Sequence, residues 1–240
     1  MAEERLDKII SSQTKLSRKD ASKRIREGGV CINGKTVLNP NEKANPDSDD
    51  ISLDGESLFY KKYVYIMMNK PKGVVSASTD KRVKTVVDLV PEKWRRENLF
   101  PAGRLDKDTT GFVLITDDGN FAHEILSPKK HIYKTYEAAL QKPLENGERA
   151  ELESGITLSG GESFLPCKIK PLNEEKTLIE IKIREGKFHQ IKKMLKYVGN
   201  EVLELKRTKL GDLPIDTALK EGKCRLLSAE EISLIRDFDQ

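Results

Sequence analysis

The sequence of 240 residues predicts an α+β protein in two parts, a small module over residues 1–60 and a larger domain over residues 61–240. Two observations carry this prediction: the charge reverses along the chain, and strand and helix patterns alternate within each part. Residues 1–35 hold nine Lys and Arg against five Asp and Glu, residues 36–60 hold one against six, and residues 61–84 hold seven against one. Separated basic patches suggest a polyanionic partner that is bound at more than one place. The alternative is an ordinary solvated surface, which is what runs of charged residues usually form.

The first module is predicted to begin with two short helices. The apolar face of the first helix consists of Leu6, Ile9 and Ile10. Ser17 has the position of an N-cap for the second helix, with Asp20 three residues later, and Gly28 ends it. The outward residues of this second helix are basic: Arg18, Lys19, Lys23 and Arg24. Asn33-Gly34 between two apolar runs then predicts a β-hairpin.

Two basic helices followed by a hairpin resemble the S4-type RNA-binding domain. The pattern Arg-Leu-Asp-Lys, then Ser-Arg-x-x-Ala, then Gly-x-Val-x-Ile-Asn-Gly runs through residues 5–34. The resemblance implies an α-L-type module whose basic helix faces neutralise RNA phosphates, a contribution that is mostly independent of base sequence and sensitive to salt. Apart from the resemblance, the same residues form an ordinary solvated helix face.

The larger domain is predicted to open with an apolar strand from Tyr63 that runs into a turn at Asn69-Lys70-Pro71. Phe112–Ile115 are four consecutive apolar residues, which is typical of a strand buried on both faces, and Leu178–Ile183 alternates as a strand with one polar face. Helices are predicted at three places: from Asn120 to Leu126, after Gly186 and from Ser228.

An acidic, hydroxyl-rich loop lies just before the apolar strand, with the sequence Gly-Arg-Leu-Asp-Lys-Asp-Thr-Thr-Gly. Its carboxylates Asp106 and Asp108 alternate with the basic residues Arg104 and Lys107. A loop next to a rigid strand is a good place to hold a reactive group still. By chemistry alone, an ordinary acidic loop and a catalytic loop are equally good interpretations.

The sequence Gly-Arg-Leu-Asp-x-Asp-Thr-Thr-Gly, followed by an apolar strand and Thr-Asp-Asp-Gly, resembles the central motif of the pseudouridine synthases. It is most similar to their RsuA-type branch, which acts on ribosomal RNA, and the resemblance makes Asp106 the catalytic aspartate. Lys-Thr-Tyr resembles the motif of the active-site tyrosine, here Tyr136. Glu-Gly-Lys-Phe-His-Gln-Ile-Lys resembles the last motif, whose basic residue pairs with the aspartate and is here Lys192. Without the family, Tyr136 would be a half-buried strand aromatic.

The resemblance implies a catalytic domain with a mixed, mainly antiparallel sheet around a cleft, needing neither a metal nor an organic cofactor. The implied reaction is isomerisation of uridine 516 of 16S rRNA to pseudouridine, within a small-subunit assembly intermediate. Candidate RNA contacts are Arg104, as a filler of the vacated base stack or a phosphate clamp, together with Lys70 and Lys187. The alternatives are a 23S rRNA synthase of the same branch and a non-catalytic RNA-binding factor of ribosome assembly.

The positions of the cysteines and the hydropathy of the chain bear on metal sites, disulfides and membrane spans. Cys31, Cys167 and Cys224 are far apart, so neither a zinc site nor a disulfide framework is indicated. The N-terminus is polar and no apolar run approaches the length of a membrane span. We therefore expect a soluble cytoplasmic protein without membrane contact, and a monomer because no interface stripe is evident.

Overall fold

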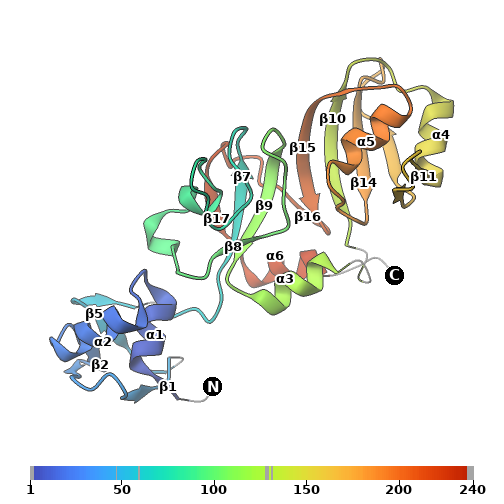
Figure 1. The fold of residues 1–240 in the computed structure, drawn as a ribbon. Coiled ribbons are helices and arrows are strands. Elements are labelled where there is room, and N and C mark those ends of the chain that lie inside the picture. The colour runs from blue at the N-terminus through green and yellow to red at the C-terminus, as the bar shows by residue number, and fades with distance from the viewer. Residues whose placement is uncertain (1–2, 47, 59, 128–129, 131, 237–240) are drawn as a thin grey trace. The chain divides into compact units, whose positions relative to one another are not determined.

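The computed structural model describes residues 3–46, 48–58, 60–127, 130 and 132–236 (Figure 1). The chain forms two compact units. One consists of Met1–Val64 and Val90–Leu99, and the other of Tyr65–Leu89 and Phe100–Gln240. The first unit therefore takes in a short segment that follows part of the second unit in the sequence.

The first unit packs two helices, α1 (Leu6–Gln13) and α2 (Arg18–Arg26), with two small antiparallel sheets. One sheet has the order β3 (Lys35–Thr36), β2 (Val30–Ile32), β5 (Ile51–Leu53) and β6 (Glu56–Ser57), and the other pairs β1 (Glu4–Arg5) with β4 (Lys43–Ala44). The core consists of Leu6, Ile9, Ile10, Ala21, Ile25, Val30, Ala44 and Ile51. The predicted N-cap is confirmed, since the Ser17 hydroxyl accepts from Asp20 N at 3.2 Å. The predicted hairpin is also confirmed, with φ of 50° at Asn33 and 76° at Gly34.

The segment Val90–Leu99 is held to the first unit by polar contacts. It contains a 3₁₀ turn at Glu92–Trp94. Arg96 Nη2 donates to Gln13 Oε1 at 2.7 Å and to the Lys61 carbonyl at 2.9 Å, and Glu92 forms an ion pair with Lys15. These contacts attach a segment distant in sequence to the end of α1.

The second unit is built on one large sheet. Its strands follow the order β13 (Lys168–Pro171), β14 (Leu178–Ile183), β10 (Lys134–Leu140), β15 (Val202–Leu210), β9 (Thr110–Thr116), β7 (Tyr65–Lys70) and β17 (Cys224–Leu226). β8 (Phe100–Ala102) pairs with β9, and β16 (Leu213–Pro214) with β15. Among the described strands of this sheet, only β15 and β9 run parallel to each other. The predicted mixed, mainly antiparallel sheet is confirmed.

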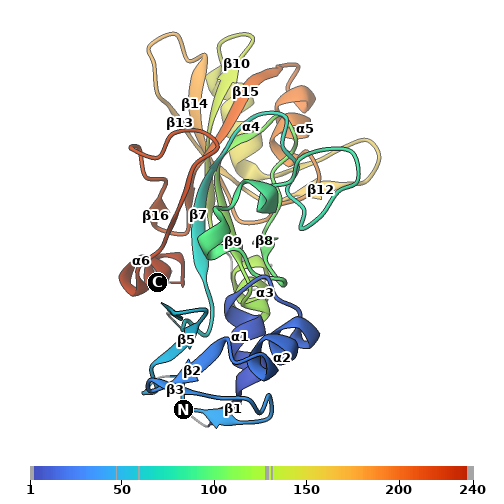
Figure 2. The same cartoon turned by 90° about the vertical axis from the view of Figure 1, so that its left-hand side faces the viewer.

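Strand β9 lies in the middle of this sheet, and every residue from Thr110 to Thr116 is buried. It pairs along its length with β7, and the two strands lie side by side in Figure 2. Because successive side chains of a strand point to opposite faces, the burial of every residue means that the apolar run is covered on both faces, as predicted. One face packs against α3 (Gly119–Leu126) and α6 (Ala229–Arg236), which an ion pair between Arg236 and Glu124 joins at 3.3 Å.

The other half of the sheet carries α5 (Gln190–Tyr197), which lies against β10 and β14 in Figure 1. α4 (Asn146–Ser154) packs near β13, and β11 (Ile156–Thr157) pairs with β12 (Ser163–Phe164) as a separate hairpin. A 3₁₀ turn occupies Val87–Leu89. Strand β15 joins the two halves of the sheet, because it pairs with β10 on one side and with β9 on the other.

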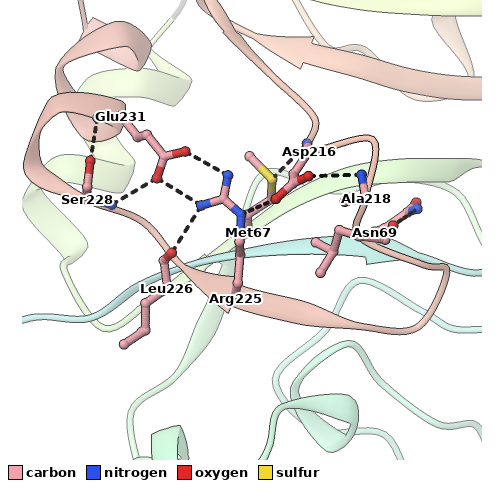
Figure 3. A network of polar contacts seen from close by, with 9 residues as sticks. Met67, Asn69, Asp216, Ala218, Arg225, Leu226, Ser228 and Glu231 are labelled. Atoms are coloured by element: carbon pink, nitrogen blue, oxygen red, sulfur yellow. Dashed lines mark hydrogen bonds and ion pairs between the residues drawn. The ribbon is translucent and has the colours of Figure 1, made fainter.

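A network around Arg225 of β17 joins α6 and the loop at Asp216 to the sheet (Figure 3). The Arg225 guanidinium donates to Asp216 at 2.6 Å and to both oxygens of Glu231 at 2.7 and 2.9 Å. Glu231 also accepts from Ser228 N at 3.0 Å and donates its own N–H to Ser228 Oγ at 3.2 Å, which is a capping box at the start of α6. The predicted Ser228 cap is confirmed. Next to this network, Asn69 Nδ2 of β7 donates to a carbonyl of the loop after Asp216, at 2.7 Å.

Candidate active site

The loop that holds Asp106 connects β8 to β9 and is bonded to the segment that follows β7. The Ser76 hydroxyl donates to the Leu105 carbonyl and accepts from Leu105 N, both at 3.0 Å. Gly73 N donates to the Lys107 carbonyl at 2.8 Å. These bonds fix the loop backbone on either side of Asp106, as a preorganised site requires.

Lys70, the last residue of β7, holds the same loop from inside the fold. Its ammonium donates to the carbonyls of Thr109 at 2.8 Å, Pro71 at 3.1 Å and Lys107 at 3.3 Å. The side chain is fully buried, and burial lowers the pKa of Lys70 to about 8. The prediction that Lys70 contacts RNA is therefore wrong, because a lysine with no exposed surface that is bonded to three carbonyls cannot reach a phosphate.

Gly111 allows β15 to approach the end of the loop. It has φ of +97°, and a Cβ atom at this position would lie 2.3 Å from the Arg207 carbonyl oxygen. A side chain there would meet backbone, so only glycine fits this close parallel contact. Since β15 also pairs with β10, the contact brings Tyr136 of β10 to the same side of the molecule as the loop.

Lys192 comes from the first turn of α5, whose entry is ordered by a buried glutamine. Gln190 is 3% exposed; its Oε1 accepts from Lys187 N at 3.1 Å and its Nε2 donates to Glu185 at 3.0 Å. His189 before it has a left-handed backbone, with φ of 54°, a conformation in which histidine is enriched among non-glycine residues. The turn before α5 thus holds Lys192 and His189 at the same place.

Two basic side chains and a second carboxylate surround Asp106. Lys192 Nζ lies 3.8 Å from Asp106 Oδ2, and His189 Nε2 lies 3.5 Å from Oδ1. Lys192 Nζ is closer to Asp108, at 2.6 and 2.7 Å from its two oxygens, and this hydrogen bond holds the pKa of Asp108 below its ordinary value. The predicted contact between Lys192 and Asp106 is present, but the hydrogen-bonded partner of Lys192 is Asp108.

Asp106, Tyr136 and Lys192 all line one small hollow of about 50 Å³, which we call the inner hollow because many of its lining residues are buried. An outer hollow of about 400 Å³ adjoins it and is large enough for a small ligand. The residues that line both hollows are Arg104, Leu105, Asp106, Gly186, Lys187 and His189. The structure therefore brings together the three side chains predicted to carry the chemistry, with Tyr136 almost buried and Asp106 at the junction.

The other predicted RNA-binding residues divide between the two units. Arg104 and Lys187 are exposed and line both hollows. The residues of the first unit lie on α2 and are exposed: Arg18, Lys19, Lys23 and Arg24. Arg24 is engaged by Asp54, with Nη2 2.6 Å from Oδ1. These four residues form a basic face on one helix, as expected.

Sequence reasoning missed three residues that shape the site. Asp108 lies two residues from Asp106, but nothing in the pattern indicates that it would take the nearest ammonium. Ser76 lies in a loop whose sequence shows no pattern of a functional site. The amide of Gln190 bonds to the turn before α5 and does not line up with any predicted catalytic role. Within the described residues, no group of three or more His, Cys, Asp and Glu side chains is arranged to hold a metal ion.

Comparison with known proteins settles the family. The family model of RNA pseudouridylate synthase matches residues 64–197, and that of the S4 domain matches residues 4–50. The chain belongs to the RNA pseudouridylate synthase family. It is 44% identical over 235 residues to an uncharacterized RNA pseudouridine synthase, YtzG, of Bacillus subtilis, covering 97% of this chain and 98% of that protein.

Other members of the family are similar over nearly the whole chain. Ribosomal small subunit pseudouridine synthase A is 39% identical in Haemophilus influenzae, covering 95% of this chain and 97% of that protein, and 37% identical in Escherichia coli, covering 96% and 99%. A solved structure described as a pseudouridylate synthase superposes with a TM-score of 0.68 at 38% identity, covering 96% of this chain and 99% of that one. The predicted enzyme class is confirmed. No helix in the described part of the chain has the length and apolar character needed to cross a membrane.

Proposed function

We propose that this pseudouridine synthase isomerises a uridine of small-subunit (16S) ribosomal RNA, with Asp106 as its catalytic carboxylate. The observation that carries the proposal is the position of Asp106 at the junction of the inner and outer hollows, beside Lys192 and His189. The similarity to small-subunit synthases over nearly the full chain supports the target class. The specific target we propose is uridine 516, within an assembling small subunit.

The reaction breaks the bond between N1 of the base and C1′ of the ribose, turns the base and joins C5 to C1′. The C5 proton leaves and N1 gains a proton, so the product is an isomer of the substrate. Asp106 acts in ionised form, either as the nucleophile at the sugar or as the base that removes a sugar proton. Lys192, 3.8 Å away, sets a positive charge beside that carboxylate. Tyr136 lines the inner hollow, where it stacks against the base and assists removal of the C5 proton.

The target uridine must leave its base stack to reach Asp106, which costs on the order of a few kcal/mol. Arg104 and Lys187 at the outer hollow attract the phosphates on either side of the flipped nucleotide. The basic face of α2 contacts RNA phosphates elsewhere through Arg18, Lys19, Lys23 and Arg24. Because these contacts are electrostatic, they add affinity that falls with salt and does not depend on base sequence.

The test is tritium release from 16S rRNA labelled at uridine C5, offered both bare and with ribosomal proteins bound. Asp106→Asn is expected to bind the RNA and release no tritium, because the amide has no charge to act as nucleophile or base. Asp212→Asn is the matched control, since Asp212 is an exposed carboxylate that lines neither hollow. Mapping of the modified nucleotide in the wild-type reaction checks uridine 516.

Three outcomes would change the proposal. Release that persists in purified Asp106→Asn removes Asp106 from the chemistry. Release from 23S rRNA and not from 16S rRNA moves the target to the large subunit. Tight, salt-sensitive binding of both RNAs without release from either favours a binding factor of ribosome assembly.

A further inference from the structure

Phe188 is the most exposed of the large hydrophobic residues that the structure describes, with 70% of its surface accessible. A single exposed apolar side chain needs no explanation on most surfaces. This one lines the outer hollow together with Asp106, and it does not line the inner hollow where Tyr136 lies. It therefore lies in the candidate active site, beside the hollow that Tyr136 lines.

The ring of Phe188 is held in a fixed orientation by its neighbour. It stacks on the His189 ring with centroids 3.8 Å apart and planes 20° apart. The left-handed backbone of His189 allows these two consecutive side chains to lie on the same side of the chain. His189 in turn contacts Asp106 at 3.5 Å, so the phenyl ring is one side chain away from the carboxylate.

Several basic side chains surround Phe188, two of which are also paired with carboxylates: Lys193 with Glu162 at 2.7 Å and Lys187 with Glu185 at 3.2 Å. Arg104, Lys107 and Lys187 line the same hollow, and Lys193 Nζ lies 5.5 Å from the centre of the phenyl ring. An exposed aromatic face among cations matches an unpaired nucleotide, which offers a flat base and a phosphate at the same time. A base-paired nucleotide in a stacked helix offers no free face for such a contact.

We propose that Phe188 is the stacking platform for the base next to the target uridine, on the 5′ or the 3′ side. The target itself faces the inner hollow, because of the two hollows only the inner one is lined by Tyr136 and Lys192 together with Asp106. Phe188 is thus a positioning residue: it holds the neighbouring base outside while the uridine is flipped inward. This inference rests on the proposed function, since it takes an RNA strand as the occupant.

The test uses a synthetic RNA stem–loop that spans uridine 516, with an abasic nucleotide placed at each loop position in turn. Phe188→Ala is expected to weaken binding about 5- to 100-fold, the range for loss of one base–aromatic stack. Phe188→Trp and Phe188→Tyr keep an aromatic face and are expected to restore binding. Phe188→Leu keeps apolar volume without the ring and should behave like the alanine variant. Thermal unfolding of each variant checks that the fold is retained.

The deciding readout is the coupling between Phe188 and one base. An abasic nucleotide beside the target should weaken wild-type binding as much as Phe188→Ala does, and the two changes together should cost no more than either alone. 2-Aminopurine at the same position should lose fluorescence on binding wild type and not on binding the alanine variant. A purely structural role for Phe188 would move neither signal at a single position.

The outcomes separate this inference from the function it rests on. Coupling to no base, coupling only to the target uridine, or full binding by the leucine variant overturns the platform. Binding is measured independently of turnover, so it is informative with or without conversion. Coupling at one position without any pseudouridine formation overturns the proposed function and leaves the platform standing.

Discussion

Replacing Lys70 by methionine tests the buried ammonium that is bonded to the loop of Asp106. The methionine keeps an apolar stem of similar length and removes the charge. In the wild type the ammonium is fully buried and donates to three carbonyls of the loop and its neighbour. The substitution therefore removes one buried charge together with the bonds that it makes to the loop.

The expected effect of this substitution on the free energy of unfolding depends on pH, and the burial of Lys70 determines its sign. Burial lowers the pKa of Lys70 from 10.5 to about 8. The folded protein loses this proton near pH 8 and the unfolded chain near 10.5, so between these values the unfolded chain binds more protons and stability rises with pH. A displacement of this size corresponds to about 3 kcal/mol. The penalty for burying the charge is present in full below pH 8 and disappears above 10.5.

The assay is urea unfolding of wild type and Lys70→Met at several values from pH 7 to pH 10, followed by far-UV circular dichroism. The free energy of unfolding of the wild type, minus that of the variant, should increase toward pH 10 by up to about 3 kcal/mol. Trp94, the only tryptophan, lies in the first unit, so its fluorescence transition is an internal control that the substitution should not move. A difference that stays constant across this range would refute the reasoning.

Two further substitutions test one contact in each unit. Gly111→Ala should destabilise the second unit by more than about 3 kcal/mol in thermal unfolding, because its Cβ would lie 2.3 Å from the Arg207 carbonyl and its φ is +97°; a variant as stable as wild type contradicts this close approach. Asp7→Asn should lower the urea stability of the first unit by about 1–3 kcal/mol at pH 7, measured by tryptophan fluorescence, because the buried carboxylate accepts from Arg5 at 2.7 Å. The hydrogen bond to Arg5 holds the pKa of Asp7 below its ordinary value, so this stabilisation is present above about pH 4 and is lost as the pH falls through the folded pKa. An effect equally large at pH 2 would contradict that assignment.

Features that depend on neighbouring residues could be predicted from the sequence. Asn33-Gly34 forms the hairpin turn, Ser228 caps the last helix, and the run from Phe112 to Ile115 is buried on both faces. Each of these rests on backbone preference or on the period of apolar residues within a few positions. A continuous motif also marks Asp106 as a candidate, and the structure places it beside Lys192 and His189.

Features that depend on distant residues could not be predicted. The parallel contact of Gly111 with Arg207 joins segments far apart in the sequence, and no local pattern marks it. A lysine at the end of a strand looks exposed from its type alone, and only the loop carbonyls around Lys70 explain its burial. The sequence motif joins Lys192 to Asp106, whereas side-chain geometry makes Asp108 the closer partner.

The chain passes from one compact unit to the other after Val64, after Leu89 and after Leu99. A domain that is joined to the rest of a protein by a single linker can be removed or transferred to another protein as one piece. Here a cut after Val64 would leave Arg96 without Gln13 and the Lys61 carbonyl, its hydrogen-bond acceptors at the end of α1. The RNA-binding unit of this enzyme therefore cannot be transferred as one continuous segment. A transfer must include residues 90–99 as well. A recombination that moves only the N-terminal segment divides one folded unit into two incomplete pieces.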